Sequence, residues 1–239
     1  MSKFFTSRKI FDNVTQIGGL GGELCYLIEG SEKALLIDGL TGVGSLKAFV
    51  RECTDLPVTL VLTHGHVDHA GASFEYGECY VNPADVALLY EHGDVDKRYG
   101  FVMGGGQPEG AFVPKKEDVV PPCAVKTLPV QDGDVFDLGG VQIEAIAVPQ
   151  LATFEAGVMF AHAEGIIPAP ESNHAIRGGI DEALRCKETG EAKTILFNLT
   201  GHGHFDMASY DRYFAGELED FAYPAEAIRE SLQHLPKVG

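Results

Sequence analysis

The sequence lacks the features of a membrane protein or an exported protein. Its longest apolar runs, such as VTLVL and TILF, are far shorter than the roughly 20 residues that cross a bilayer. The first residues, MSKFFTSRKIF, lack the apolar stretch and the cleavage site of a signal peptide. We therefore expect a cytoplasmic protein with no membrane partner.

Cysteines and basic residues are also few. The five cysteines are widely spaced and form no CxxC motif, which predicts neither a disulfide framework nor a thiolate zinc site. The chain has 18 Lys and Arg residues against 35 Asp and Glu, so its formal net charge is −17. This negative charge opposes binding to phosphate backbones, and we expect no nucleic-acid partner. No GxSxG or Cys/His nucleophile motif indicates a serine or cysteine hydrolase.

What the sequence does contain is enough apolar material for a core, 45% of 239 residues, in patterns that alternate between strand and helix. Short apolar runs between glycines predict hairpin strands from about 10 to 40. A helical stripe over 42–53 precedes the buried strand VTLVL. A second helix is expected over 82–93, with Asn82 as its N-cap before Pro83.

The rest of the chain changes from strands to helices. Residues 93–122 are rich in Gly, Pro and charge and predict a long surface loop, and 125–148 predict further strands. After Pro149 we expect helices at 151–165 and 172–190, then a buried strand at 193–199, and then helices at 206–221 and 224–235.

A cluster of potential metal ligands follows the strand VTLVL, in the stretch LTHGHVDHAGA. Side chains two apart in extended chain point the same way, so His64 and His66 face one side. Asp68 and His69 come beside them where the chain turns into a helix. Imidazoles and a carboxylate suit zinc, and they accept iron or manganese. The sequence predicts one cation position at the His64/His66 pair and a second at Asp68/His69.

These residues carry a resemblance. The stretch TLVLTHGHVDHAGAS, with KALLIDGLTG before it and LPVQDGDVFDLGGVQIEAIAVP after it, resembles the metallo-β-lactamase superfamily, whose metal motif is HxHxDH. The likeness runs from about Phe11 to Pro149 and includes Asp38. It implies an αββα sandwich and hydrolysis of an ester, thioester, lactam or phosphodiester by hydroxide on one or two metal ions. Asp68 is then catalytic, because it ligates metal and orients the nucleophile.

The resemblance breaks after Pro149, where the family continues with Gly-His and this chain has Gln150 and Leu151. The third histidine is therefore missing from its expected place, and the family's later bridging Asp has no match. Three protein ligands and a water suffice for a catalytic zinc. A recruited histidine could complete the site, and the candidates are His162, His174, His202 and His204.

A second resemblance covers about 148–237. The stretches EGIIPAPESNHA and FNLTGHGHFDM are similar to the C-terminal part of the tryptophan synthase β chain. This resemblance implies that Glu171 and Thr200 lie at a pyridoxal phosphate ring. It also implies that the HGHxD sequence of His202 and His204 belongs to a tryptophan synthase-like segment and is not a metal motif. The Schiff-base lysine of that family has no matching motif here, so we expect no pyridoxal phosphate.

Together these patterns predict an α/β protein of two domains. Residues 1–149 form a partial αββα metallo-β-lactamase-like sandwich, and 150–239 form an α/β segment of tryptophan synthase β-chain type. Three hypotheses stay open: a metal-dependent hydrolase, a pyridoxal phosphate enzyme, and a folded chimera without activity. The first predicts a small-molecule substrate, and the oligomeric state is left open.

Overall fold

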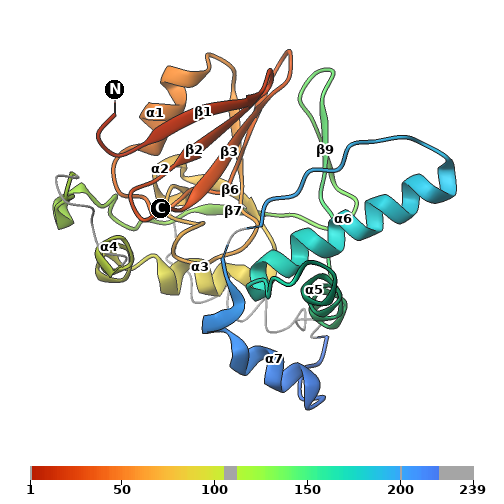
Figure 1. Cartoon of the computed structure of the whole chain (residues 1–239). Helices are drawn as coiled ribbons and strands as arrows, with labels where there is room; N and C mark the ends of the chain where they lie inside the picture. The colour runs from red at the N-terminus through yellow and green to blue at the C-terminus, as the bar shows by residue number, and fades with distance from the viewer. Residues whose placement is uncertain (1, 105–111, 200, 221–239) are drawn as a thin grey trace. The chain divides into compact units, whose positions relative to one another are not determined.

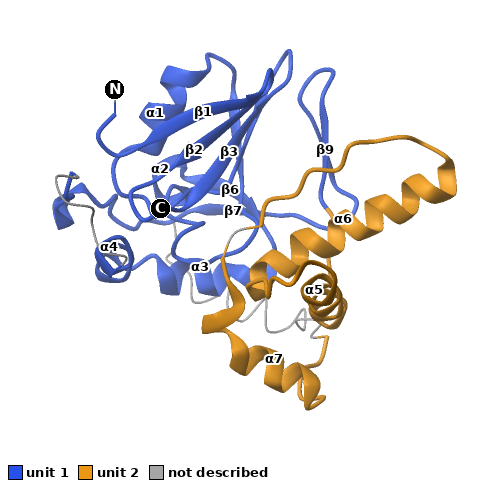
Figure 2. Cartoon of the chain, viewed as in Figure 1, with its two compact units in different colours: residues 1–145, 223–239 blue, residues 146–222 orange. Residues whose placement is uncertain are grey.

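The computed structural model describes residues 2–104, 112–199 and 201–220, which belong to two compact units (Figure 2). Unit 1 contains the described residues up to Ala145, and unit 2 contains those from Ile146 onward. Helices and strands are mixed, so the α/β class expected from the sequence is confirmed. No helix of the described residues is long and apolar enough to cross a membrane.

Unit 1 is built on a seven-stranded sheet whose strands follow one another in chain order. They are β1 (Thr6–Phe11), β2 (Val14–Gly18), β3 (Leu24–Glu29), β4 (Ala34–Ile37), β5 (Val58–Val61), β6 (Glu78–Val81) and β7 (Lys126–Pro129). The first four pair antiparallel, and β4 to β7 pair parallel. Figure 1 shows β1, β2 and β3 side by side in this sheet. A separate hairpin joins β8 (Val135–Asp137) and β9 (Gln142–Glu144). The strands predicted between 10 and 40 and between 125 and 148 are therefore confirmed, while β1 and β6 were not predicted.

Some helical segments of unit 1 begin at a residue whose side chain caps them, and others have no such cap. They are α1 (Leu46–Cys53), α2 (Ser73–Tyr76), α3 (Val86–His92) and α4 (Val95–Gly104), with 3-10 turns η1 (Pro83–Asp85) and η2 (Lys116–Asp118). The Ser45 hydroxyl accepts a hydrogen bond from the Ala48 N–H at 3.1 Å at the start of α1. The Asn82 side chain accepts one from Ala84 N–H at 3.0 Å, which confirms the predicted N-cap.

The core of unit 1 lies on one face of the sheet. Alternation along β2 and β3 buries Ile17, Cys25 and Leu27 completely, and the neighbouring positions are half-buried. Leu46 of α1 and Leu89 of α3 join the same apolar cluster. This cluster fixes both helices against the sheet, which is what positions the loops at its edge.

The predicted surface loop over 93–122 is wrong for residues 95–104, which form α4. Val102 is fully buried in a small cluster with Val43 and Val119. Arg98 is also buried, and its Nε donates a hydrogen bond to the Gly93 carbonyl at 3.1 Å. The glycines and charges of this stretch predicted a loop. The prediction failed because the residues that bury this helix lie far away in sequence and leave no local pattern. Residues 105–111 lie outside the described part.

Unit 2 consists of helices in its described part. They are α5 (Gln150–Glu164), α6 (Pro170–Thr189) and α7 (Met207–Phe214), with the 3-10 turn η3 (Gly203–Phe205). The first two confirm the helices predicted at 151–165 and 172–190. The ring of Phe154 lies 5.2 Å from that of Tyr210, whose hydroxyl donates to the Pro168 carbonyl at 2.7 Å. These contacts join α5, α7 and the chain before α6.

Two predictions for unit 2 fail. The strand expected at 193–199 is absent: that stretch has no regular structure, and Leu196 is 69% exposed. A strand needs a neighbour for its backbone bonds, and the described part of unit 2 offers only an isolated bridge between Pro168 and His202. The helix expected over 206–221 ends at Phe214. The helix expected at 224–235 lies outside the described residues.

Candidate metal centre

The candidate site lies where two parallel strands of unit 1 end. β4 and β5 are neighbours, and Ile37 is paired with Val61. Asp38 therefore comes next to the segment 63–69, called here the histidine loop, although 25 residues separate Asp38 from Thr63. The carboxyl ends of parallel strands are a common place for ligand sites, because the loops that follow them meet at one edge.

Asp38 organises this edge. Its backbone is left-handed, with φ of 67°, and such conformations at non-glycine residues cost about 1–3 kcal/mol and cluster at functional sites. Its carboxylate accepts hydrogen bonds from the Thr63 N–H at 2.8 Å and the Thr63 hydroxyl at 2.9 Å. The same carboxylate lies 2.9 Å from Nδ1 of His69. One buried carboxylate thus holds both ends of the histidine loop.

The structure brings the predicted ligands of this loop together. The ring centroid of His64 lies 4.7 Å from that of His66 and 4.0 Å from that of His69. Oδ2 of Asp68 lies 3.3 Å from Nε2 of His69. The side chains His64, His66, Asp68 and His69, chosen from spacing alone, therefore form one contiguous group.

The charges of Asp68 and His69 are coupled. Burial by itself lowers the pKa of His69, but its bonds to Asp38 and Asp68 outweigh burial and raise the pKa to about 10. Burial likewise opposes ionisation of Asp68, yet the bond to His69 leaves the pKa of Asp68 below its ordinary value. In the absence of another cation, His69 is a protonated imidazolium between two carboxylates.

His64 has the opposite character. Burial and the neighbouring His69 lower the pKa of His64 to about 4, so its imidazole is neutral at pH 7. Nδ1 of His64 lies 3.0 Å from the Thr63 hydroxyl, whose single hydrogen is donated to Asp38. His64 must then be the donor to Thr63, which assigns its proton to Nδ1. Its Nε2 is left with a free lone pair, and this atom is buried without a partner.

These residues fit a divalent cation in kind. Three imidazoles and a carboxylate are ordinary zinc donors. The ring of His64 is in the tautomer whose Nε2 carries no proton, and this unpartnered nitrogen can bind a metal. The 3.3 Å between Asp68 and His69 is close to the roughly 3.3–3.4 Å that separates two ligands of one tetrahedral zinc. Within residues 2–104, 112–199 and 201–220, no three His, Cys, Asp or Glu side chains are arranged so that they could hold one metal ion. A bound cation therefore requires side-chain rotation in the loop.

The other predicted site residues belong to unit 2. His202 and His204 are exposed and stack at 4.2 Å, and Nδ1 of His202 accepts a hydrogen bond from the His204 N–H at 3.2 Å. This contact caps η3, a structural role. Glu171 is exposed in the first turn of α6. Thr200 lies outside the described residues. The remaining candidates, His162 and His174, are exposed on α5 and α6.

Two residues of the site were missed from the sequence. Thr63 was overlooked, although its place directly before the first ligand could have suggested a bond to it. His92, the last residue of α3, lies with its ring centroid 5.3 Å from that of His66 and nearly parallel to it, at 22°. No spacing rule connects positions 66 and 92, because their contact depends on how α3 packs.

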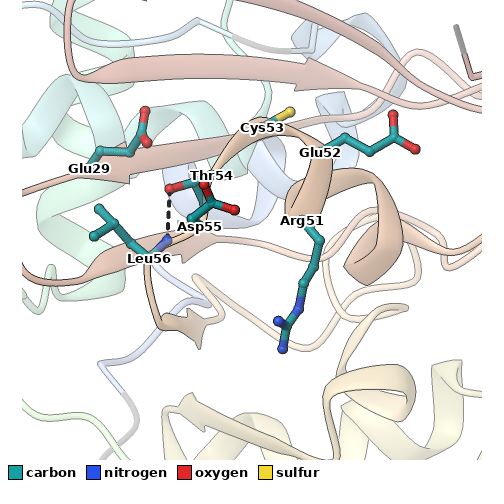
Figure 3. A pocket seen from close by; sticks show the side chains of 7 residues that line it. All are labelled: Glu29, Arg51, Glu52, Cys53, Thr54, Asp55 and Leu56. Carbon is teal, nitrogen blue, oxygen red and sulfur yellow. Dashed lines mark hydrogen bonds between the residues drawn. The ribbon is translucent and has the colours of Figure 1, made fainter.

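A separate polar hollow of about 370 Å³ lies in unit 1 around the end of α1 (Figure 3). It is lined by Glu29, Arg51, Glu52, Cys53, Thr54, Asp55 and Leu56. Its acidic side chains point apart in Figure 3, and the bond drawn is that from the Leu56 N–H to the Thr54 hydroxyl, 3.3 Å. The hollow holds no histidine, so the histidine loop remains the stronger candidate.

One family model matches most of unit 1. Residues 18–147, more than half of the chain, match the family model described as "Metallo-beta-lactamase superfamily". The matched span contains the sheet from β3 to β7 and the whole histidine loop. A solved structure of the metallo-beta-lactamase SMB-1 with mercaptoacetic acid is 23% identical, covers 61% of this chain and 54% of that chain, and has a TM-score of 0.42.

Part of the chain is also similar to tryptophan synthase beta chains. It is 67% identical over 76 residues to beta chain 2 of Methanosarcina acetivorans, which is 32% of this chain and 17% of that relative. It is 60% identical over 86 residues to beta chain 2 of Aquifex aeolicus, 36% of this chain and 19% of that relative. The second resemblance expected from the sequence is confirmed. The chain spans less than a fifth of the length of these relatives.

Proposed function

Because the chain belongs to the metallo-beta-lactamase superfamily, we propose that it is a hydrolase that depends on a divalent cation held by its histidine loop. The fold of unit 1 is that of metal-dependent hydrolases. The observation that carries the proposal is Nε2 of His64, a buried, unprotonated nitrogen that has no partner within the described residues. A buried polar atom left in this way costs about 1–3 kcal/mol, which coordination would recover.

The residues that would hold the cation are His64, His66, Asp68 and His69, with zinc as the first choice and iron or manganese as alternatives. When bound, such an ion lowers the pKa of a water to about 7 and polarises the bond to be cleaved. The chain supplies the orientation. Thr63 keeps His64 in the tautomer with a free Nε2, and Asp38 holds Nδ1 of His69, so each ring presents Nε2.

Asp68 is the proposed catalytic residue. It is half-buried at the edge of the sheet, and its pKa below the ordinary value keeps it ionised at pH 7. An ionised carboxylate at this place accepts a hydrogen bond from the attacking water and directs its lone pair towards the substrate. The proposed substrates are small molecules with an ester, thioester, lactam or phosphodiester bond.

The proposal also covers the partners, the compartment and the cofactor of the protein. A formal charge of −17 opposes binding to nucleic acids and anionic membranes, so neither is a proposed partner. We place the activity in the cytoplasm. Pyridoxal phosphate is not part of the proposal, because no lysine stands in a motif that would form the internal aldimine.

The test is metal content followed by activity. The protein is freed of metal with a chelator, supplied with Zn²⁺, Fe²⁺ or Mn²⁺, and desalted, and bound metal per chain is measured by mass spectrometry. We expect at least one zinc ion per chain in the wild type and a loss in His64→Ala. Asp12→Asn, which neutralises an exposed carboxylate at a turn far from the motif in sequence, is the control. Equal metal content in wild type and His64→Ala would contradict the proposal.

Activity is then measured with chromogenic esters, thioesters, lactams and phosphodiesters. We expect hydrolysis only in the metal-loaded wild type, and its loss in Asp68→Asn. Metal binding without turnover of any of the four classes would instead favour the folded chimera without activity.

A further inference from the structure

We propose that His92 is a metal ligand that completes the three-histidine position of the site, in place of the histidine missing after Pro149. This inference rests on the proposed function, because it assumes that the histidine loop binds a cation. It concerns a residue that lies outside the HxHxDH motif and belongs to a different helix.

The first argument is how closely α3 packs on the histidine loop. A Cβ at Gly65 would lie 2.6 Å from the Asp85 carbonyl oxygen and 2.8 Å from the Leu89 nitrogen, closer than side-chain atoms come to backbone. The Gly65 N–H also donates to Oδ1 of Asp85 at 3.2 Å. Only glycine allows this approach, so the loop packs directly on η1 and α3, and α3 ends with His92 beside His66.

The second argument is that the end of α3 is fixed from its other side too. His92 is the last residue of the helix, and a Cβ at Gly93 would lie 2.4 Å from Cζ of Phe74. Backbone on both sides of His92 is therefore confined. The carbonyl end of a helix also favours a nearby positive charge. A ligand at this position requires rotation of its own side chain and no movement of the chain.

The third argument is the distance between the rings. Two imidazoles that bind one tetrahedral zinc through nitrogens at about 2.0–2.1 Å have ring centres about 5.2 Å apart. The centroids of His66 and His92 are 5.3 Å apart. Nδ1 of His92 is buried and has no partner among the described residues, so no existing bond must be broken to turn it. The rings of His64, His66 and His92 then supply three nitrogen donors, which is enough for a catalytic zinc with water.

The test measures zinc affinity by competition with a chromophoric chelator, and it measures the visible spectrum after loading with Co²⁺. Wild type is compared with His92→Ala, with His92→Gln in case the smaller residue disturbs folding, and with Asp12→Asn, at an exposed turn, as control. Thermal unfolding of the metal-free variants checks that each is folded. We expect at least a tenfold loss of zinc affinity in both His92 variants, a changed Co²⁺ spectrum, and wild-type behaviour of Asp12→Asn.

The outcomes separate the two proposals. If wild type and all variants fail to bind zinc, the proposed function fails and this inference fails with it. If His64→Ala loses zinc while the His92 variants keep wild-type affinity and spectrum, the hydrolase proposal stands and His92 is not a ligand. Loss of affinity in His202→Ala or His204→Ala with intact His92 variants would assign the missing position to unit 2 and overturn the inference.

Discussion

Asp38 and His69, 31 residues apart in sequence, form a hydrogen bond of 2.9 Å that links the end of β4 to the histidine loop after β5. The bond holds Nδ1 of His69 and so decides which nitrogen of the ring remains for a ligand. Asp38 does this from a left-handed backbone, a conformation that aspartate tolerates better than most residues. Asp38 therefore orients the ring of His69.

Replacing Asp38 by asparagine is expected to weaken zinc binding by about 10–100-fold, the usual cost of losing a partner that orients a metal ligand. Asparagine keeps the shape and the left-handed preference, so the backbone should be retained. The measurement is chelator competition, together with an NMR titration of His69, whose pKa should fall. Asp12→Asn, at an exposed turn, is the matched control and should change neither.

The metal-free protein should be most stable near pH 6.5. The folded-state pKa of His69 is raised to about 10, so its contribution is present below pH 6.5 and is lost as pH rises. The folded-state pKa of His64 is lowered to about 4, so its contribution is lost as pH falls below 6.5. Each proton changes the free energy of unfolding by at most about 1.4 kcal/mol per pH unit.

Denaturant unfolding in the presence of a chelator, between pH 5 and 7.5, measures both slopes below the range in which cysteine and tyrosine titrate. His69→Gln should remove the decline above pH 6.5 and keep the decline below it. A stability that rises steadily across this range in the wild type would contradict the assignment of the two histidines.

Gly65→Ala should destabilise the protein by about 1–3 kcal/mol, because the new methyl group overlaps the backbone of η1 and α3. Gly100→Ala is the matched control: this glycine lies in α4, has a negative φ, and an added Cβ there meets nothing within 4 Å. Alanine in that helix should stabilise by about 0.5–1 kcal/mol. Chemical unfolding of both variants tests the contrast, and equal effects would show that α3 does not pack on the loop as described.

Arg98→Met should destabilise unit 1 by about 1–3 kcal/mol. The buried guanidinium donates to the carbonyls of Gly93 and Val120, and methionine fills the volume but leaves both oxygens without a partner. Lys97→Met, one position away and exposed, should stay within about 0.5 kcal/mol of the wild type. Urea unfolding distinguishes the two. Equal stabilities for the two variants would mean that Arg98 forms no essential bonds.

Local pattern predicted much of unit 1 because β2 and β3 alternate and because α1 and η1 begin at side-chain caps. The His64/His66 and Asp68/His69 pairs could be predicted for the same reason: their spacing within one loop is itself the signal. His92 could not, because its approach to His66 depends on a glycine in one segment and a helix in another. Whether the loop binds metal stays a prediction.

The errors have a common physical cause. Arg98 and Val102 belong to a stretch with a loop-like composition, yet in α4 they have contacts that are distant in sequence, Arg98 with Val120 and Val102 with Val119. The residues 193–199 have strand-like composition, yet strand formation depends on a neighbouring strand. In both stretches tertiary contacts decided the outcome against local preference.

The exposed stretch KTILFNL has a practical consequence for handling the protein. Ile195, Leu196 and Phe197 are 37%, 69% and 38% exposed, and the backbone around them forms no ladder with any described strand. Short β-prone segments without charge between them are the usual starting points of amyloid-like aggregation. We expect solutions of the protein to become turbid when they are concentrated or warmed. Leu196→Lys should delay the turbidity and leave metal binding by the histidine loop unchanged.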